Sequence, residues 1–147
     1  MNPETLFSAA SLLAMVGWLV LLASPWALRQ TQFVSGIAIP LVLSVGYTAI
    51  ILTSWANAEG GFGSLVDVAT LFESPMLLLG GWIHFLAFDL FIGAWQVRTA
   101  RRAAIPFLLV VPCLFLTFMF GPVGLLAFMI LRTARTGFAT NPPVSAD

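Results

Sequence analysis

The hydrophobic positions of this chain fall into long runs that short polar links separate. A membrane-spanning helix needs about 20 mostly apolar residues, and four runs reach that length, at about residues 6–28, 33–55, 75–97 and 106–131. The first two runs are joined by a short polar link, so these helices should form an antiparallel hairpin. The pattern predicts an all-α integral membrane protein built as a four-helix bundle.

A different pattern lies between the second and third spans. Residues 57–64 form a glycine-rich loop, and residues 65–73 place apolar side chains near helical spacing, with Asp67 and Glu73 between them. This predicts a short amphipathic segment that lies at the membrane surface or folds over the bundle as a lid. The runs leave no room for a soluble domain, so residues 1–147 should form one transmembrane domain with a disordered tail at 136–147.

Helix-breaking residues interrupt two of the predicted spans. Pro40 lies inside the second span and frees a backbone carbonyl that a neighbouring helix must satisfy. In the fourth span, Gly121, Pro122 and Gly124 break the backbone at membrane depth. Such breaks line a cavity or let helices approach closely.

The composition agrees with a membrane protein. The chain is 60% hydrophobic and only 8% charged, with a mean hydropathy of +1.01, which is far more apolar than a soluble domain. The six basic residues balance six acidic ones, so there is no basic patch of the kind that binds a phosphate backbone. Nucleic acid is therefore excluded as a partner.

The scarce residue types exclude several kinds of cofactor chemistry. There is no lysine, so neither a retinal Schiff base nor a pyridoxal enzyme can be built. Cys113 is the only cysteine, which rules out an internal disulfide and a cysteine metal cluster. His84 is the only histidine, so one chain cannot supply a two-His-one-carboxylate iron site. A haem with one axial ligand stays formally open, but we expect neither a cofactor nor a metal.

The ends of the predicted spans suggest an orientation and a membrane. Residues 1–5 lack the basic start of a signal peptide, so the first helix should be retained. With four spans, Arg29, Arg98, Arg101 and Arg102 share one side and two arginines the other, which by the positive-inside rule places both termini outside the cytoplasm. Basic residues that are all arginine are typical of a high-GC bacterial source, so we expect a bacterial inner membrane protein.

The third span carries the strongest candidates for chemistry, His84 and Asp89. A titratable side chain at bilayer depth costs about 2.5 to 3.5 kcal/mol on insertion scales and tends to mark function. At 100° per residue the two lie about 140° apart around the helix and about 7.5 Å apart along it, so they cannot form a close ion pair. A neutral carboxylic acid and a neutral imidazole can act as acid and base near pH 7. A structural hydrogen bond at each residue is the alternative.

Aromatic residues lie between these two polar groups on the helix surface. Asp89 shares a face with Phe85, while His84 aligns with Phe88 and Trp95, so a long apolar ligand along this wall could meet both groups. The predicted binding residues are Trp82, Phe85, Phe88, Trp95, Tyr47, Thr117 and Phe120. The alternatives are an interhelical hydrogen bond for Tyr47, a bond to its own helix for Thr117, and ordinary packing for the phenylalanines. Whether Asp67, Glu73 or Arg98 joins the site stays open.

Two stretches resemble a known family. Residues 81–93 contain the pattern Trp-x-His-x-x-x-Phe-Asp-Leu-Phe, and residues 116–126 contain Gly-Pro-x-Gly. Together they resemble the neoxanthin-synthase family, related to the plant abscisic-acid-deficient membrane proteins, and the four-helix layout is similar. The resemblance implies a carotenoid substrate, because the plant proteins are associated with turning the epoxide of violaxanthin into the allenic end group of neoxanthin.

That conversion is an isomerisation, and it suits the residues present. An acid would protonate the epoxide oxygen and a base would remove a polyene proton, so no redox cofactor is needed. The resemblance and the helix geometry together suggest Asp89 as the acid and His84 as the base. The chain would then be a xanthophyll isomerase that acts on an epoxy-carotenoid within the membrane lipid.

Two other classes of function remain open at the sequence level. The chain could bind a carotenoid or another isoprenoid lipid without changing it, or serve in the assembly of a pigment complex. It could also relay protons or carry a small solute, although four spans without an internal repeat would then need a homo-oligomer. Pigment that co-purifies unchanged would favour binding, and turnover lost on replacing His84 would favour the enzyme.

Overall fold

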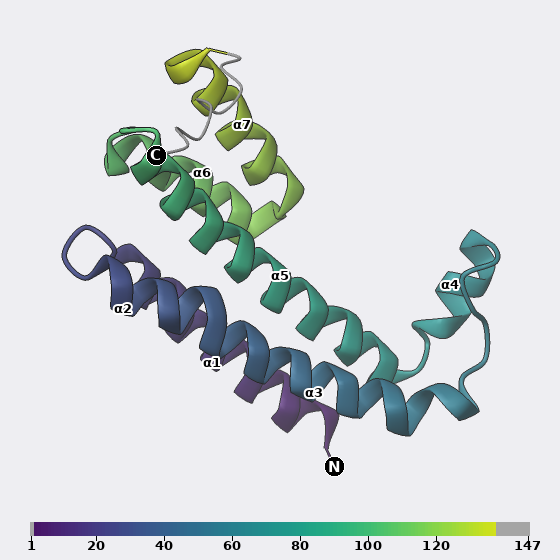
Figure 1. Cartoon of the computed structure of the whole chain (residues 1–147). Coiled ribbons are helices and arrows are strands. Elements are labelled where there is room, and N and C mark those ends of the chain that lie inside the picture. The colour runs from purple at the N-terminus through teal and green to yellow at the C-terminus, as the bar shows by residue number, and fades with distance from the viewer. Residues whose placement is uncertain (1, 138–147) are drawn as a thin grey trace, which may run out of the picture. The chain divides into compact units, whose positions relative to one another are not determined.

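The computed structural model describes residues 2–137, which are mostly helical and contain no strand (Figure 1). The helices are, in chain order, α1 (Pro3–Leu22), α2 (Leu28–Phe33), the π-helix η1 (Val34–Ala38), α3 (Ile39–Ser54), the 3₁₀-helix η2 (Trp55–Asn57), α4 (Leu65–Leu71), α5 (Pro75–Arg102), α6 (Phe107–Phe120) and α7 (Pro122–Thr136). They pack as two compact units, divided within α5 between Ala94 and Trp95.

Three helical segments are long and apolar enough to cross a membrane: α1, the continuous stretch Leu28–Asn57, and α5. The predicted all-helical class is therefore confirmed and the three long apolar segments support membrane association, but the four-helix bundle is not confirmed. The fourth predicted span, 106–131, is interrupted at Gly121 and forms α6 and α7. With 14 residues, α6 is about 21 Å long, which is shorter than the hydrocarbon core of about 30 Å.

The boundaries of the first two spans differ from the predicted ones because of Pro25. The proline disfavours helical backbone at the residue before it, and α1 ends at Leu22 instead of continuing to about residue 28. The buried Ser24 hydroxyl bonds to the Leu21 carbonyl and lies 3.2 Å from the Thr31 hydroxyl. These contacts close the turn, and the next helix begins at Leu28.

Pro40 has a local structural effect on the second span, whereas the bond predicted from a neighbouring helix to the freed carbonyl stays a prediction. Pro40 has no backbone N–H for the carbonyl four residues earlier, and its ring would collide with that carbonyl. The chain forms the π-turn η1 just before it, and the Ile39 N–H bonds to the Val34 carbonyl five residues back. Within η1 the buried Ser35 hydroxyl donates to the Gly17 carbonyl of α1 at 2.7 Å, which ties the two helices together.

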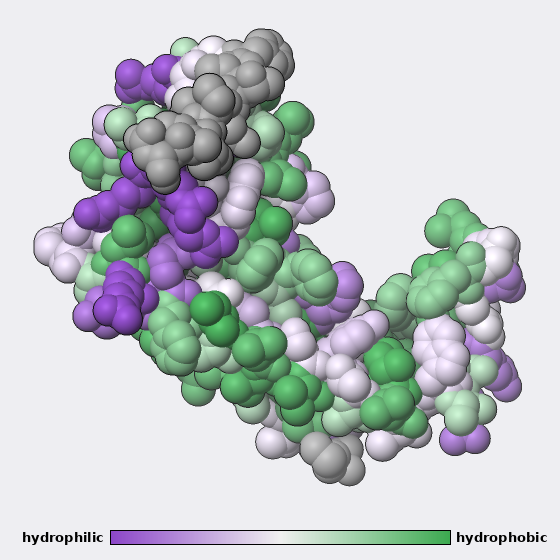
Figure 2. All heavy atoms as spheres, in the orientation of Figure 1, coloured by the Kyte–Doolittle hydropathy of each residue, from purple (hydrophilic) through white to green (hydrophobic). Residues whose placement is uncertain are grey.

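The first unit is held by the buried side of α5 packed against α1 and α3. A Cβ added at Gly93 of α5 would lie 2.7 Å from Cη2 of Trp18 on α1, so the absence of a side chain permits this close approach. The buried apolar residues of this unit include Ala14, Trp18, Leu21, Leu43, Ile50, Ile83, Leu86 and Leu90. Many large apolar side chains are nevertheless exposed, and Figure 2 shows them as green surface along these helices. Such a surface suits lipid rather than water.

The second unit contains the end of α5, α6 and α7. Gly121 has φ +48° and joins α6 to α7, which pack against each other. A polar pair lies inside the unit: Nε2 of the buried Gln96 donates to the Thr117 hydroxyl at 2.9 Å, and that hydroxyl donates to the Cys113 carbonyl at 2.8 Å.

Two further predictions concern the segments outside the long spans. The short helix predicted over 65–73 is confirmed as α4, and the Ser64 hydroxyl caps its start by accepting the Asp67 N–H at 3.1 Å. The disordered tail predicted at 136–147 lies almost wholly outside the described residues. That the chain is a single domain stays a prediction.

Candidate functional site

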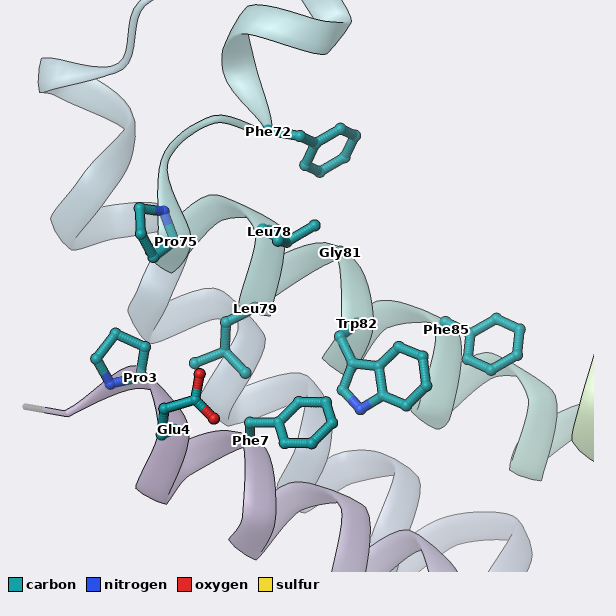
Figure 3. A pocket seen from close by; sticks show the side chains of 10 residues that line it. All are labelled: Pro3, Glu4, Phe7, Phe72, Pro75, Leu78, Leu79, Gly81, Trp82 and Phe85. Carbon is teal, nitrogen blue, oxygen red and sulfur yellow. The ribbon is translucent and has the colours of Figure 1, made fainter.

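Three apolar cavities of the first unit lie along α5. The Trp82 cavity, of about 690 Å³, lies between the N-terminal end of α1 and α5 (Figure 3). Phe7 of α1 and Trp82 point toward one another with ring centroids 5.4 Å apart, and Phe85 stacks on Trp82 at 5.5 Å. The Trp82 indole N–H donates to the Ser11 hydroxyl of α1 at 3.0 Å. Among the described residues of this lining, Glu4 is the one with an ionisable side chain.

The His84 cavity, of about 560 Å³, lies between α3 and α5 and is bounded at one end by the segment that includes α4. It is lined by Tyr47, Ile51, Trp55, Phe62, Leu71, Phe72, Leu77, Gly81 and His84. Phe72 and Gly81 also line the Trp82 cavity. A Cβ added at Gly81 would lie 3.0 Å from the Phe72 ring, so Phe72 at the end of α4 forms the wall between the two cavities. The predicted lid interpretation of α4 agrees with this placement but is not tested by it.

The Phe88 cavity, of about 340 Å³, continues along the same seam between α3 and α5. It is lined by Gly36, Ile37, Pro40, Leu41, Ser44, Ala87, Phe88 and Phe91. Along α5, residues 77, 81, 84, 88 and 91 recur at three and four residues and so share one helix face. The distance from residue 77 to residue 91 is about 21 Å along the helix. We call this seam, with its two cavities, the α3–α5 groove.

His84 lies at the junction of the two cavities of the groove. It lines the His84 cavity, and its ring stacks on Phe88 of the next cavity with centroids 4.6 Å apart and planes 23° apart. On the α3 side its ring faces Tyr47, with centroids 5.7 Å apart and a tilt of 59°. A ligand in the His84 cavity would therefore lie against the imidazole.

Asp89 lies on another side of α5. Phe85, four residues earlier, and Gly93, four residues later, share its helix face. Asp89 lines none of the three cavities. Its Oδ2 atom is buried and has no hydrogen-bond partner among the described residues. The wide separation of His84 and Asp89 around the helix is as predicted, and the structure does not bring them together at one cavity.

The other predicted binding residues fall into separate places. Trp82 and Phe85 line the Trp82 cavity, and Phe88 lines the cavity named after it, whereas Trp95, Thr117 and Phe120 belong to the second unit. In that unit Trp95 meets Phe128 edge to face, and the Thr117 hydroxyl is fully buried and hydrogen-bonded as described above. Their roles as ligand contacts stay predictions.

The charged residues left open by the sequence are also placed. Asp67 and Glu73 line none of the three cavities, and Arg98 belongs to the second unit. The described residues contain no group of three or more His, Cys, Asp or Glu side chains arranged to hold a metal ion.

Sequence reasoning missed several cavity-lining aromatics. Phe7, Trp55, Phe62 and Phe72 line the Trp82 or His84 cavity. Trp55 and Phe62 stack with centroids 5.5 Å apart, so the loop before α4 is fastened to the end of the second span. The available signal was their position: all four lie at or beside the ends of apolar runs, where aromatic residues usually anchor a helix at the membrane interface.

Comparison with known proteins bears on what these cavities serve. Over residues 5–128 the chain matches the ABA DEFICIENT 4-like family. The chain belongs to that family. Membership in the ABA DEFICIENT 4-like family confirms the resemblance drawn from residues 81–93 and 116–126, and it implies a role in carotenoid- and xanthophyll-related biosynthesis. No curated protein and no solved structure matches the chain. The bacterial source stays a prediction.

Proposed function

We propose that this ABA DEFICIENT 4-like protein is a membrane-embedded isomerase of an epoxidised carotenoid, which lies in the α3–α5 groove with its reacting end beside His84. The observation that carries the proposal is the position of His84, a titratable group between two apolar cavities on one seam. Ligand sites of this kind are mostly apolar with a few placed polar groups, and a rod-like polyene suits a long, aromatic-lined groove.

The reaction needs one proton removed and one proton added. His84, as the base, takes the proton from the polyene carbon next to the ring, and that electron pair forms the second double bond of the allene. The bond between the epoxide oxygen and the neighbouring ring carbon breaks, and the oxygen accepts a proton to become a hydroxyl. Substrate and product have the same atoms and the same oxidation state, so the step uses acid–base catalysis alone.

Turnover by the purified protein tests the proposal. The full chain in lipid vesicles is given violaxanthin, and the pigments are separated by chromatography. His84→Gln should lower turnover by about 100-fold or more, the usual contribution of a general base, while pigment still binds. Thr48→Val is the matched control, because Thr48 is exposed on α3 and its hydroxyl donates to the Ser44 carbonyl of its own helix.

The second candidate function is carotenoid binding without chemistry. The Trp82 cavity favours it, because this cavity is the largest of the three and its lining carries one titratable residue, Glu4. If the wild-type protein binds violaxanthin and returns it unchanged, the isomerase proposal is wrong and the binding function replaces it.

A further inference from the structure

We infer that Tyr47 is the proton donor that acts opposite His84 at the α3–α5 groove. The inference rests on the proposed isomerase function and names the partner that the base requires. Tyr47 is on α3 and His84 is on α5, and their rings meet across the seam with centroids 5.7 Å apart and planes tilted by 59°. Both side chains line the His84 cavity, so a reacting group in that cavity can contact both.

The chemistry of the cavity lining leaves Tyr47 as the donor. Among the nine described residues that line the His84 cavity, Tyr47 and His84 are the only two with a side chain able to donate or accept a proton in the reaction. The tryptophan in the lining has an indole N–H that donates hydrogen bonds but does not give up its proton. A phenol can both donate a hydrogen bond to the epoxide oxygen and transfer the proton to it.

Asp89 does not fit the same role. It projects from α5 about 140° around the helix from His84, and it lines neither cavity of the groove. From that side of α5, the Asp89 carboxyl would have to protonate an epoxide oxygen that lies beside His84, on another face of the helix. We therefore assign the role of the acid to Tyr47 in place of Asp89. The packing of α3 against α5 is what brings Tyr47 next to His84.

The proton balance closes within the pair. Tyr47 gives its proton to the epoxide oxygen as the carbon–oxygen bond breaks, and His84 takes the proton that leaves the polyene carbon. The phenolate and the imidazolium then face each other, and one proton transfer from His84 to Tyr47 restores both groups. A phenol is a stronger acid than the tertiary alcohol that forms, so the transfer to oxygen runs downhill.

The test compares Tyr47→Phe with Asp89→Asn in the violaxanthin assay. Tyr47→Phe keeps the ring and removes one oxygen atom, and it should lower turnover by about 100-fold or more. Violaxanthin should bind up to about fivefold more weakly, since one neutral hydrogen bond contributes about 1 kcal/mol. Asp89→Asn and the control Thr48→Val should both retain turnover.

Binding of zeaxanthin, which has no epoxide, separates a chemical role from a packing role. Quenching of tryptophan fluorescence reports its affinity, which Tyr47→Phe should leave within about twofold, a change well below the loss of one hydrogen bond. A loss of zeaxanthin affinity equal to the loss of turnover would overturn the inference, because Tyr47 would then only shape the cavity.

The remaining outcomes distinguish this inference from the proposed function. If His84→Gln abolishes turnover while Tyr47→Phe retains it, the isomerase stands and the role of Tyr47 is wrong. The same conclusion follows if Asp89→Asn removes turnover and Tyr47→Phe does not. If the wild-type protein binds violaxanthin without converting it, the proposed function fails and the inference falls with it.

Discussion

The Thr117 hydroxyl of the second unit either stabilises the fold through its bond with Gln96 or contacts a ligand, and one substitution distinguishes these two roles. Thr117→Val keeps the shape of the side chain but removes a buried hydroxyl, which accepts from Gln96 Nε2 at 2.9 Å. The buried Gln96 amide then loses this partner. An unsatisfied buried polar group costs about 1 to 3 kcal/mol, and side-chain hydrogen bonds in membranes average about 0.6 kcal/mol with a maximum near 1.7. We therefore expect a loss of about 1 to 2 kcal/mol in the free energy of unfolding.

A double-mutant cycle measures this loss in the purified protein. Unfolding is followed by circular dichroism in mixed detergent micelles for Thr117→Val, Gln96→Leu and the pair. The double variant should recover part of the loss, because it leaves no amide unpaired. Thr136→Val is the matched control: its exposed hydroxyl bonds to the Arg132 carbonyl of the same helix, so it should change stability by less than about 0.5 kcal/mol. Unchanged stability in Thr117→Val together with weaker carotenoid binding would refute the reasoning and make Thr117 a ligand contact.

Three further predictions concern packing, burial and topology. Gly93→Ala should lower the free energy of unfolding by about 1 to 3 kcal/mol, because its Cβ would lie 2.7 Å from the Trp18 ring. Gly46→Ala is the control: its Cβ would enter open space, so it should leave stability unchanged or raise it. Equal melting temperatures for the two variants would contradict the close packing at Gly93. Asp89→Leu should stabilise by about 1 to 3 kcal/mol, since it removes a buried oxygen that has no hydrogen-bond partner among the described residues. A lower unfolding midpoint in denaturant would contradict this expectation. Because α6 and α7 are each shorter than the hydrocarbon core and pack against each other around Gly121, the ends of α5 and α7 should share one side of the membrane. In a Cys113→Ala background, cysteines replacing residues 102 and 135 should then react with an impermeant thiol reagent from the same side, and labelling from opposite sides would restore the predicted fourth crossing.

The sequence specified most of the secondary structure through local chemistry. Long apolar runs can satisfy their backbone in lipid only as helices, so α1, the second span and α5 followed from composition and length. The starts of α4 and α5 at Ser64 and Pro75 are also local effects, because a hydroxyl cap and a proline in the first turn act within a few residues. The separation of His84 and Asp89 around one helix was likewise fixed by the helical repeat alone.

Breaks in those helices were only partly evident from the sequence. Gly121 and Pro122 were recognised as a backbone break at membrane depth, yet the stretch was predicted as one span. How far a helix bends at a glycine depends on which helices it can pack against, and local sequence does not contain that information. Here α7 packs on α6, and the Thr117 side chain is buried inside the unit.

What only the tertiary structure decided is which side chains share a cavity. His84 was a candidate from the sequence because a lone imidazole at membrane depth is costly. Tyr47, which contacts His84, lies 37 positions earlier in the chain on α3, and Phe72 lies at the C-terminal end of α4. Whether these residues reach His84 depends on the positions of α3 and α4 along the axis of α5. That register is set by contacts between helices, such as Trp18 against Gly93, and contacts between distant residues leave no periodic trace in a single sequence.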